Sequence, residues 1–330
     1  MTESTNIKPL KKIIFFGIIL LCLFSIPKVG LSNFWLHLLD MVLINAILAL
    51  GLNIVLKTGQ VSLAHAAFFA VGSYGSAHFT LMLGWPFLVA LLVSSLTCGA
   101  MALILGRLIL HLKGVYFILL TFAVNELVFL LAKDLTSITG GNTGITGIKW
   151  PHVPFIGVIG NKADFYYLAL VVFLIVFFSL YIIYRSPFGR AMDSIRESES
   201  LASATGYDPM KIKLIAFFIG ACIAGLGGSL FAHFTRYIAP FNFTFWESVN
   251  FLIMNIIGGA FSIAGPVIGA LVLTPLPEFF REYVLWQQTL YGLVLILFMR
   301  FLPDGVVSVF VTFYNFMKRT LIDTFQKRIN

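Results

Sequence analysis

Long apolar runs, separated by short polar or glycine- and proline-containing breaks, fill most of the 330-residue sequence. A transmembrane helix needs about 20 apolar residues, whereas a membrane β-barrel has strands of about ten residues with alternating polarity. The unbroken runs therefore predict membrane-spanning helices. Hydrophobic residues make up 59% of the chain and charged residues only 11%, while soluble domains are about 25% charged. This composition excludes a water-soluble globular enzyme.

The runs divide into ten candidate spans, which predict an all-α polytopic membrane protein with about ten (8–10) transmembrane helices. The candidate spans are 13–29, 36–56, 61–83, 86–110, 115–132, 165–184, 212–235, 245–264, 266–282 and 285–302. Residues 1–12 precede a single transmembrane domain, 13–303, and residues 304–330 form a tail. Two hydrophilic loops, 133–164 and 185–212, interrupt the apolar pattern.

The distribution of basic residues predicts the orientation of these spans. With the N-terminus inside, 16 of the 22 Lys and Arg residues fall on the cytoplasmic side and six on the other. Cytoplasmic loops carry an excess of Lys and Arg, so we expect both termini and the 185–212 loop to be cytoplasmic and the 133–164 loop to be external. The first run resembles a signal peptide, but it lacks an Ala-x-Ala site, which favours a retained helix.

The sequence offers little for catalysis or metal binding. Cys22, Cys98 and Cys222 lie inside apolar stretches without CxxC spacing, which predicts buried packing thiols. The six histidines show no HExxH or other metal spacing, and no Gly-x-Ser-x-Gly elbow occurs. The chain also has no Gly-x-x-x-x-Gly-Lys-Ser/Thr loop, which is the usual cradle for ATP phosphates.

The 185–212 loop carries strong helix signals. Ser186 followed by Pro187 is typical of a helix start, Gly206 is typical of a helix stop, and Asp208 followed by Pro209 predicts the start of the next span. One helical stripe between these signals is formed by Ala191, Ile195 and Ala202. We expect a short amphipathic helix here. An ordinary solvated loop is the alternative, but small residues with flanking charges favour a docking surface for a separate protein.

Two features inside the spans need a structural explanation. Asp40 lies four residues into the second span and is expected at the membrane interface. Gly220, Ala224 and Gly228 recur every four residues in the seventh span, a pattern that lets helices approach closely in lipid. This pattern predicts a packing seam, either within the chain or against a partner subunit.

Several short motifs occur in a fixed order from about Leu48 to Gly305, and together they resemble the LivM-type permease family of branched-chain amino acid ABC importers. The motifs are Gly51-Leu52-Asn53, Gly59-Gln60-Val61-Ser62-Leu63, His65-Ala66-Ala67-Phe68-Phe69, Leu112-Lys113-Gly114-Val115-Tyr116, Glu126, the 136–147 stretch, Ser186-Pro187-Phe188-Gly189-Arg190, Ile195-Arg196-Glu197, Lys211-Ile212-Lys213, Gly258-Gly259 and Gly265-Pro266-Val267-Ile268-Gly269-Ala270. The chain departs from the family pattern at Lys57-Thr58 and at Phe261, so local packing there does not carry over.

The resemblance implies an ABC importer permease of the type II-like kind in a bacterial cytoplasmic (inner) membrane. It implies that this chain is not an enzyme and binds no cofactor, because ATP and Mg²⁺ are held by two partner ATP-binding subunits. The other implied partners are a second, related permease subunit in a heterodimer, an external solute-binding protein and the lipid bilayer, with no nucleic acid. The expected ATPase-coupling interface consists of Arg190, Arg196, Glu197, Glu199, Ala202 and Gly206.

Polar residues inside the spans are the candidates for a substrate path: Glu126, Asn125, Thr121 and Asn53. Glu126 is the strongest candidate, because burying an ionisable group in the hydrocarbon costs free energy and such a group normally has a partner. The alternative for Glu126 is an interhelical clamp to Asn53, Asn45 or a backbone group.

Three functions remain open at this stage. The leading hypothesis is a permease subunit that imports branched-chain or other small amino acids. Within the same family, urea and short amides are competing substrates. A stand-alone ion-coupled transporter, with Glu126 and Lys57 as coupling charges, belongs to another class but leaves the 185–212 helix unexplained, and a structural membrane subunit is disfavoured by the polar positions inside the spans.

Overall fold

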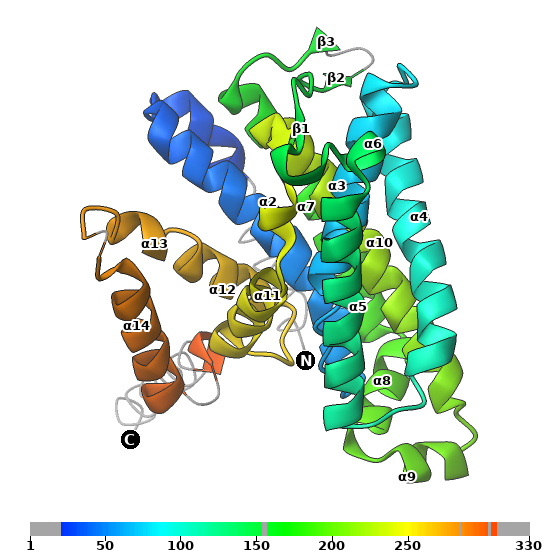
Figure 1. Ribbon diagram of the computed structural model, residues 1–330. Helices are drawn as coiled ribbons and strands as arrows, with labels where there is room; N and C mark the ends of the chain where they lie inside the picture. The colour runs from blue at the N-terminus through cyan, green and yellow to red at the C-terminus, as the bar shows by residue number, and fades with distance from the viewer. Residues whose placement is uncertain (1–20, 154–156, 284, 303–304, 309–330) are drawn as a thin grey trace, which may run out of the picture.

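The computed structural model describes residues 21–153, 157–283, 285–302 and 305–308, and helices dominate this part of the chain (Figure 1). The elements are η1 (Ile26–Val29), α2 (Asn33–Leu56), α3 (His65–Leu81), α4 (Phe87–Ile109), α5 (Val115–Asp134), α6 (Thr136–Thr139), η2 (Gly141–Thr143), β1 (Ile145–Thr146), β2 (His152–Val153), β3 (Gly157–Val158), α7 (Lys162–Arg185), α8 (Pro187–Glu197), α9 (Glu199–Ala204), α10 (Pro209–Thr235), β4 (Tyr237–Ile238), η3 (Pro240–Phe243), α11 (Phe245–Gly258), α12 (Ala264–Leu273), α13 (Leu276–Phe279) and α14 (Gln287–Phe301).

Five helices in the described part are long and apolar enough to cross a membrane: α2, α4, α5, α7 and α10. Each of them matches a predicted span to within three residues at both ends. These matches confirm the all-α polytopic fold class. Of the first predicted span, 13–29, residues 13–20 lie outside the described residues, and residues 21–29 are helical and include η1.

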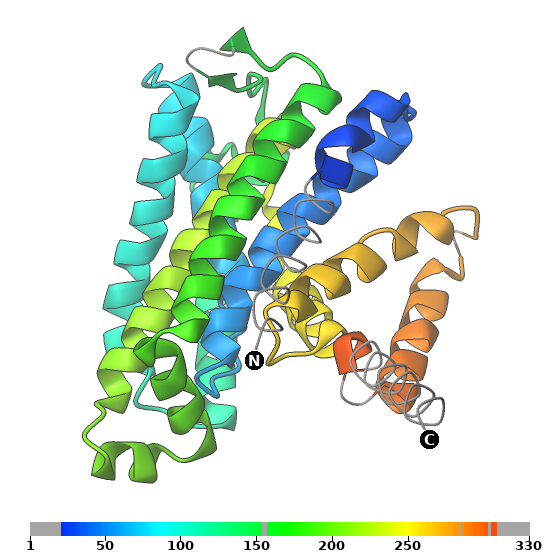
Figure 2. The ribbon, with the colours of Figure 1, turned by 180° about the vertical axis from the view of Figure 1, so that it is seen from behind.

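The small-residue seam of α10 packs inside the chain. A methyl group at Gly220 would collide with the backbone of Gly51 on α2, and one at Gly72 on α3 would collide with Gly225 on α10. Gly225 in turn lies against the backbone of Ser95 on α4. The helices α2, α3 and α4 therefore pack against α10 at backbone contact. Figure 2 shows α10 from behind, between α4 and α7. Of the two interpretations of the seam, the structure shows packing within the chain.

Helix α3 begins at His65, although the apolar pattern predicts a span from residue 61. Residues 57–64 form no regular secondary structure and are mostly buried. His65 Nε2 lies 2.8 Å from the carbonyl oxygen of Leu48, two turns before the end of α2. The 57–64 segment therefore returns into the bundle alongside α2 before α3 starts. Side-chain oxygens satisfy its backbone, because Leu63 N–H donates to Thr121 Oγ1 at 3.0 Å.

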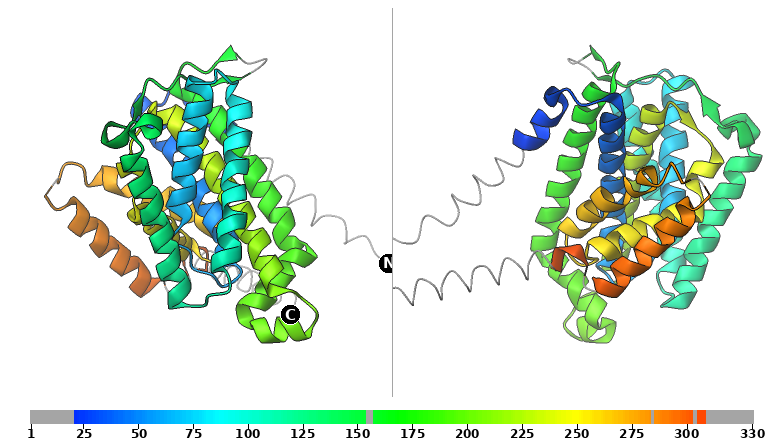
Figure 3. Two further views of the ribbon diagram at one scale, coloured as in Figure 1. Left: turned by 45° about the vertical axis from the view of Figure 1, so that its right-hand side comes forward. Right: turned by 90° about the vertical axis from the view of Figure 1, so that its left-hand side faces the viewer.

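The last three predicted spans, 245–264, 266–282 and 285–302, appear as shorter helices. Helices α11, α12 and α14 have 14, 10 and 15 residues, fewer than the roughly 20 that a straight crossing needs. Figure 3 shows α12 and α14 beside the long-helix bundle rather than inside it. The α11–α12 pair crosses at backbone contact, since a Cβ at Gly269 would overlap the carbonyl of Met254.

The two ends of the bundle differ (Figure 1). We call the end that carries α8 and α9 the α8 end, and the opposite end the α6 end. At the α6 end, antiparallel β1 and β4 pair Ile145 with Ile238, and antiparallel β2 and β3 pair His152 with Val158. The predicted loop 133–164 is therefore a folded segment that contains α6, η2 and β1–β3.

Asp40, which the sequence predicts at the membrane interface, is fully buried within the chain. Neither of its carboxylate oxygens has a hydrogen-bond partner among the described residues. Helix α2 starts at Asn33, so Asp40 lies two turns inside the helix. Its depth in the membrane stays a prediction.

Candidate functional site: the α8 end and the polar face of α5

The helix signals of the 185–212 loop are confirmed. Ser186 Oγ accepts the N–H of Gly189 at the start of α8, and Asp208 Oδ1 accepts the N–H of Lys211 at the start of α10. Gly206 has φ +91° just after α9. The single helix that we expected is instead two, because Ser198 is extended and caps α9 through the N–H of Leu201.

Helix α8 is tied to the bundle by charged side chains. Lys57 Nζ, at the end of α2, lies 2.6 Å from Asp193 Oδ1 on α8 and 4.9 Å from the centre of the Tyr184 ring on α7. The Arg196 guanidinium lies 4.0 Å from the centre of the Phe261 ring in the α11–α12 turn and 3.9 Å from Asp193. One face of α8 therefore contacts α2, α7 and the α11–α12 turn together.

Helix α9 is tied down by Glu199. Its carboxylate pairs with Lys213, whose side chain is only 3% exposed, and with Lys113 at 2.8 Å. Burial raises the pKa of the Glu199 carboxyl, but the hydrogen bonds from Lys113 and Lys213 outweigh it and hold that pKa below its usual value. Glu199 thus links α9 to α10 and to the turn between α4 and α5.

The six expected coupling residues divide into two groups. Arg196, Glu199 and Ala202 face the bundle, where they make the contacts above or are buried. Arg190, Glu197 and Gly206 are exposed at the α8 end. The structure adds Leu201, which is 69% exposed on α9. An apolar residue next to the stripe residue Ala202, about 100° away from it around the helix, was the signal that could have identified Leu201 from the sequence.

Asn53 lies in a buried network above α8. Its amide nitrogen donates to Asn255 Oδ1 at 2.8 Å and to the carbonyl of Ala260 at 2.7 Å, and its oxygen accepts the Tyr184 hydroxyl at 2.6 Å. Asn255 also donates to the carbonyl of Ala49 at 2.9 Å. This network joins α2, α7, α11 and the α11–α12 turn.

The other path candidates share α5. Thr121 and Asn125 are fully buried one turn apart, and both amide atoms of Asn125 lack a hydrogen-bond partner in the described ranges. Glu126 is half-buried. Within the described ranges, Glu126 does not bond Asn53, whose partners are given above, or Asn45, which donates to Thr274 at 3.0 Å. The structure thus brings Thr121, Asn125 and Glu126 together and places Asn53 in a separate network.

Comparisons with known proteins now give the family. A family model described as the permease component of a branched-chain amino acid transport system matches residues 34–302. The high-affinity branched-chain amino acid transport system permease protein LivM of Salmonella typhimurium is 32% identical over 290 residues, which cover 81% of this chain and 68% of that protein. LivM of Escherichia coli is 32% identical over 288 residues, with 80% and 68% covered.

A second kind of branched-chain amino acid permease protein is also similar to this chain. The high-affinity branched-chain amino acid transport system permease protein LivH of Escherichia coli is 24% identical over 291 residues, which cover 80% of this chain and 91% of LivH. No solved structure matches the chain. The family match over most of the sequence, on a fold of apolar membrane helices, shows that this chain is a multi-pass membrane protein that belongs to the branched-chain amino acid transport permease family.

Proposed function

We propose that the chain is the permease subunit of an ATP-driven importer of branched-chain amino acids, and that α8 and α9 form its docking surface for the ATP-binding subunits. The observation that carries this proposal is the combination of bundle contacts and exposed side chains at the α8 end. One side of α8–α9 is clamped to the bundle through Asp193, Arg196 and Glu199. Arg190, Glu197 and Leu201 are exposed, and two charged side chains with one large apolar side chain suit a surface for a protein partner.

The contacts of α8 supply a route from this surface to the spans. A displacement of α8 acts on the end of α2 through the Lys57–Asp193 pair and on the α11–α12 turn through the stacked Arg196 and Phe261. Both places connect directly to Asn53, which bonds Asn255 and Ala260. Packed elements of this kind have discrete arrangements, so a small shift at one surface can reposition a helix pair.

The proposed setting follows from charge and from the relatives. The excess of Lys and Arg on the side of the α8 end supports an orientation in the cytoplasmic membrane with α8 and α9 inside. The similarity to both LivM and LivH supports pairing with a second, related permease. Two ATP-binding subunits and an external solute-binding protein complete the proposed importer, and ATP and Mg²⁺ are bound by the ATP-binding subunits.

Reconstitution tests this function. The chain is purified with its genomic partner subunits, placed in proteoliposomes, and assayed for uptake of radioactive leucine with ATP on the α8 side. We expect uptake that requires ATP and is abolished by L201D, while L201M, which keeps an apolar side chain, retains it. Both variants are checked for membrane insertion. Ion-driven uptake by the chain without ATP-binding subunits, or uptake of urea or short amides in place of leucine, would contradict the proposal.

A further inference from the structure

A cavity of about 360 Å³ lies at the α6 end, between residues 149–152 and the α3–α4 turn, residues 82–86. Figure 1 shows this turn at the same end of the bundle as β2. The cavity walls combine two tryptophans with a lysine and a histidine: Trp85, Trp150, Lys149 and His152. Small-molecule sites have volumes of about 300–1,000 Å³ and place a few polar groups among apolar walls. The cavity has the size and the composition of such a site.

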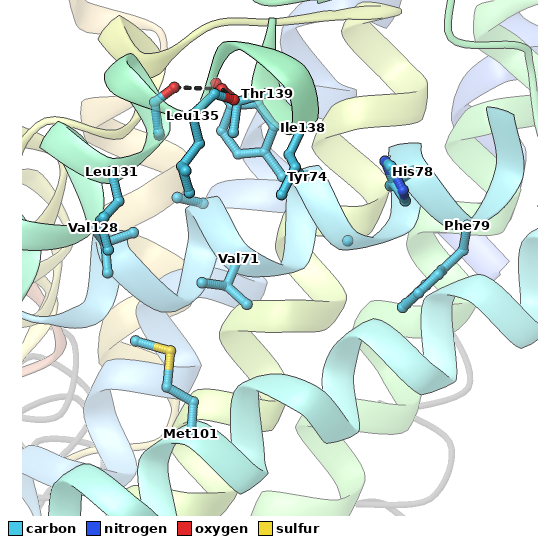
Figure 4. A pocket seen from close by; sticks show the side chains of 13 residues that line it. Val71, Tyr74, His78, Phe79, Met101, Val128, Leu131, Leu135, Ile138 and Thr139 are labelled. Atoms are coloured by element: carbon cyan, nitrogen blue, oxygen red, sulfur yellow. Dashed lines mark hydrogen bonds between the residues drawn. The ribbon is translucent and has the colours of Figure 1, made fainter. Parts of the chain in front are cut away.

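This cavity differs from the groove between α3, α4 and α5, which Figure 4 shows. That groove is lined mainly by aliphatic side chains such as Val71, Val128 and Leu131, and none of its lining residues is a lysine, an arginine or an acid. At the α3–α4 turn, in contrast, Lys149 and His152 both line the cavity and are exposed. A ligand at the turn can therefore meet polar side chains.

Two side chains at the end of α10 hold the backbone beside the cavity. His233 is buried, and its Nδ1 lies 2.9 Å from the carbonyl oxygen of Lys149. Because a carbonyl oxygen only accepts hydrogen bonds, Nδ1 is the donor in this contact. Arg236 Nε donates to the carbonyl oxygen of Ile148 at 3.2 Å. The backbone that carries Lys149 is therefore positioned by the fold, which lowers the entropy lost when a ligand binds.

The charges around the cavity favour an anion. None of its lining residues is acidic, and Lys149 forms no ion pair among the described residues. The Arg236 guanidinium adds a second cation, 5.8 Å from the centre of the Trp150 ring. The carboxylate of Asp164 belongs to the neighbouring groove between α4 and α7, where it accepts the Asn161 amide at 2.9 Å. The cavity thus presents a lysine without a counter-ion in the described part of the chain.

The α3–α4 turn beside the cavity is apolar and exposed. Met82 and Leu83 are 68% and 53% exposed, and Trp85 is exposed as well. Exposing large apolar side chains to water costs free energy, whereas the boundary between hydrocarbon and headgroups accepts them and is enriched in tryptophan. We therefore expect the turn to lie in this boundary, with the basic cavity at the depth of the lipid headgroups.

We propose that this cavity binds the phosphate headgroup of an anionic phospholipid. Lys149 and His152 donate hydrogen bonds to the phosphate oxygens, and the acyl chains lie against Met82 and Leu83. A free phosphate ion has the same acceptor oxygens but leaves the apolar turn in water, so the exposed turn favours a lipid. The inference goes beyond the proposed function and does not depend on it, because it uses only the α6 end of this chain.

The first experiment compares two lysines at the α6 end. The full-length chain is purified in mild detergent as wild type, K149Q or K133Q, and its affinity for phosphatidylglycerol is measured by native mass spectrometry. Lys133 is exposed at the end of α5 and does not line the cavity. We expect K149Q to weaken binding about fivefold, the contribution of one lysine near an anionic membrane surface, and K133Q to bind as wild type does. Equal losses would show a general effect of surface charge and overturn the inference.

The second experiment separates binding from folding. His233 contacts the backbone carbonyl of Lys149, which K149Q keeps, so without added lipid K149Q should melt at the same temperature as wild type. At the second donor, H152Q keeps a side-chain N–H group and should retain more phosphatidylglycerol binding than H152L. Wild-type lipid affinity in both K149Q and H152L would overturn the inference.

The third experiment identifies the source of the anion. Phosphatidylcholine has the same acyl chains but no net charge, and we expect it to bind more weakly than phosphatidylglycerol. Displacement of phosphatidylglycerol by an equal concentration of inorganic phosphate or glycerol 3-phosphate would show a site for free anions. Unchanged lipid binding in K149Q, together with a weaker complex with the external solute-binding protein, would show a protein contact. Either of these two results overturns the inference.

Discussion

The amide nitrogen of Asn53 lies 2.8 Å from the amide oxygen of Asn255, a contact between residues that are 202 positions apart. Because Asn53 also bonds Ala260 and Tyr184, a single side chain on α2 holds α7, α11 and the α11–α12 turn. Tyr184 in addition lies beneath the Lys57 ammonium that contacts α8. Asn53 therefore connects the α8 end to the α11–α12 pair.

Replacement of either asparagine is expected to destabilise the protein. N53A leaves three buried groups without a partner and should cost about 3 kcal/mol, and N255A should cost less. The double variant should lose less unfolding free energy than the two single variants together. The expected difference is about 0.6 kcal/mol, which is the average coupling energy between hydrogen-bonded side chains in a membrane protein. Unfolding in mild detergent measures all three. Strict additivity would show that the two side chains do not interact, and N142A, at an exposed position of η2, provides the control.

The Lys57–Asp193 pair is expected to respond unequally to mutation. The Lys57 side chain is 8% exposed and that of Asp193 is 39% exposed. D193A leaves a buried ammonium unpaired and should cost about 3 kcal/mol. K57M leaves the Asp193 carboxylate, which reaches water and lies near Arg196, so this variant should lose less unfolding free energy than D193A. Thermal unfolding of the two variants compares them directly, and a larger loss for K57M would refute this assignment of the buried charge.

The ion pairs of Glu199 should make stability depend on pH. The pKa of Glu199 is lower in the folded chain than its usual value of 4.5. A lowered carboxyl pKa stabilises the folded state above the unfolded pKa, and this contribution disappears as the pH falls through the folded pKa. The melting temperature of E199Q should therefore lie below that of wild type at neutral pH, and the two should converge only when the pH falls below the lowered pKa of the folded state. A constant difference across this range would contradict the assignment.

Two glycines on neighbouring short helices should behave in opposite ways. A Cβ at Gly269 would overlap the Met254 carbonyl, whereas a Cβ at Gly292 on α14 would meet no atom within 4 Å. G269A should therefore separate α11 from α12 and reduce folded yield severely. G292A should be neutral or stabilise α14 by up to about 1 kcal/mol, because alanine favours helices over glycine. Folded yield on size-exclusion chromatography distinguishes them, and equal yields would argue against close α11–α12 packing.

Hydropathy predicted the five long helices well because each is a continuous apolar run closed by a local signal, such as Ser186 or Asp208. It failed where tertiary contacts replace local ones. The 57–64 segment reads as part of a span, yet it stays irregular because Thr121 and other side chains satisfy its backbone. Likewise, the Gly258-Gly259 pair is a helix-stop signal, and Gly259 has φ +121° at the end of α11, but the sequence does not show that the carbonyl of Gly265 lies against Gly258.

The candidate site was predicted in part. Polarity within a span singled out Thr121, Asn125 and Glu126, which lie on α5, and their role in a substrate path stays a prediction. Capping signals located α8. The sequence could not show that Arg196 and Glu199 contact the bundle, because only tertiary folding brings their partners Phe261 and Lys213 next to them.

The glycine contacts of α10 also determine how the chain can move. Where backbones touch, as between Gly220 and Gly51 or Gly225 and Gly72, no side chain is available to change rotamer and absorb a displacement. The four helices α2, α3, α4 and α10 should therefore move as one rigid body during transport. The elements that move relative to this body should then be those with few buried residues, such as α14, which has none. Amide hydrogens should accordingly exchange slowest in α10 and fastest in α14.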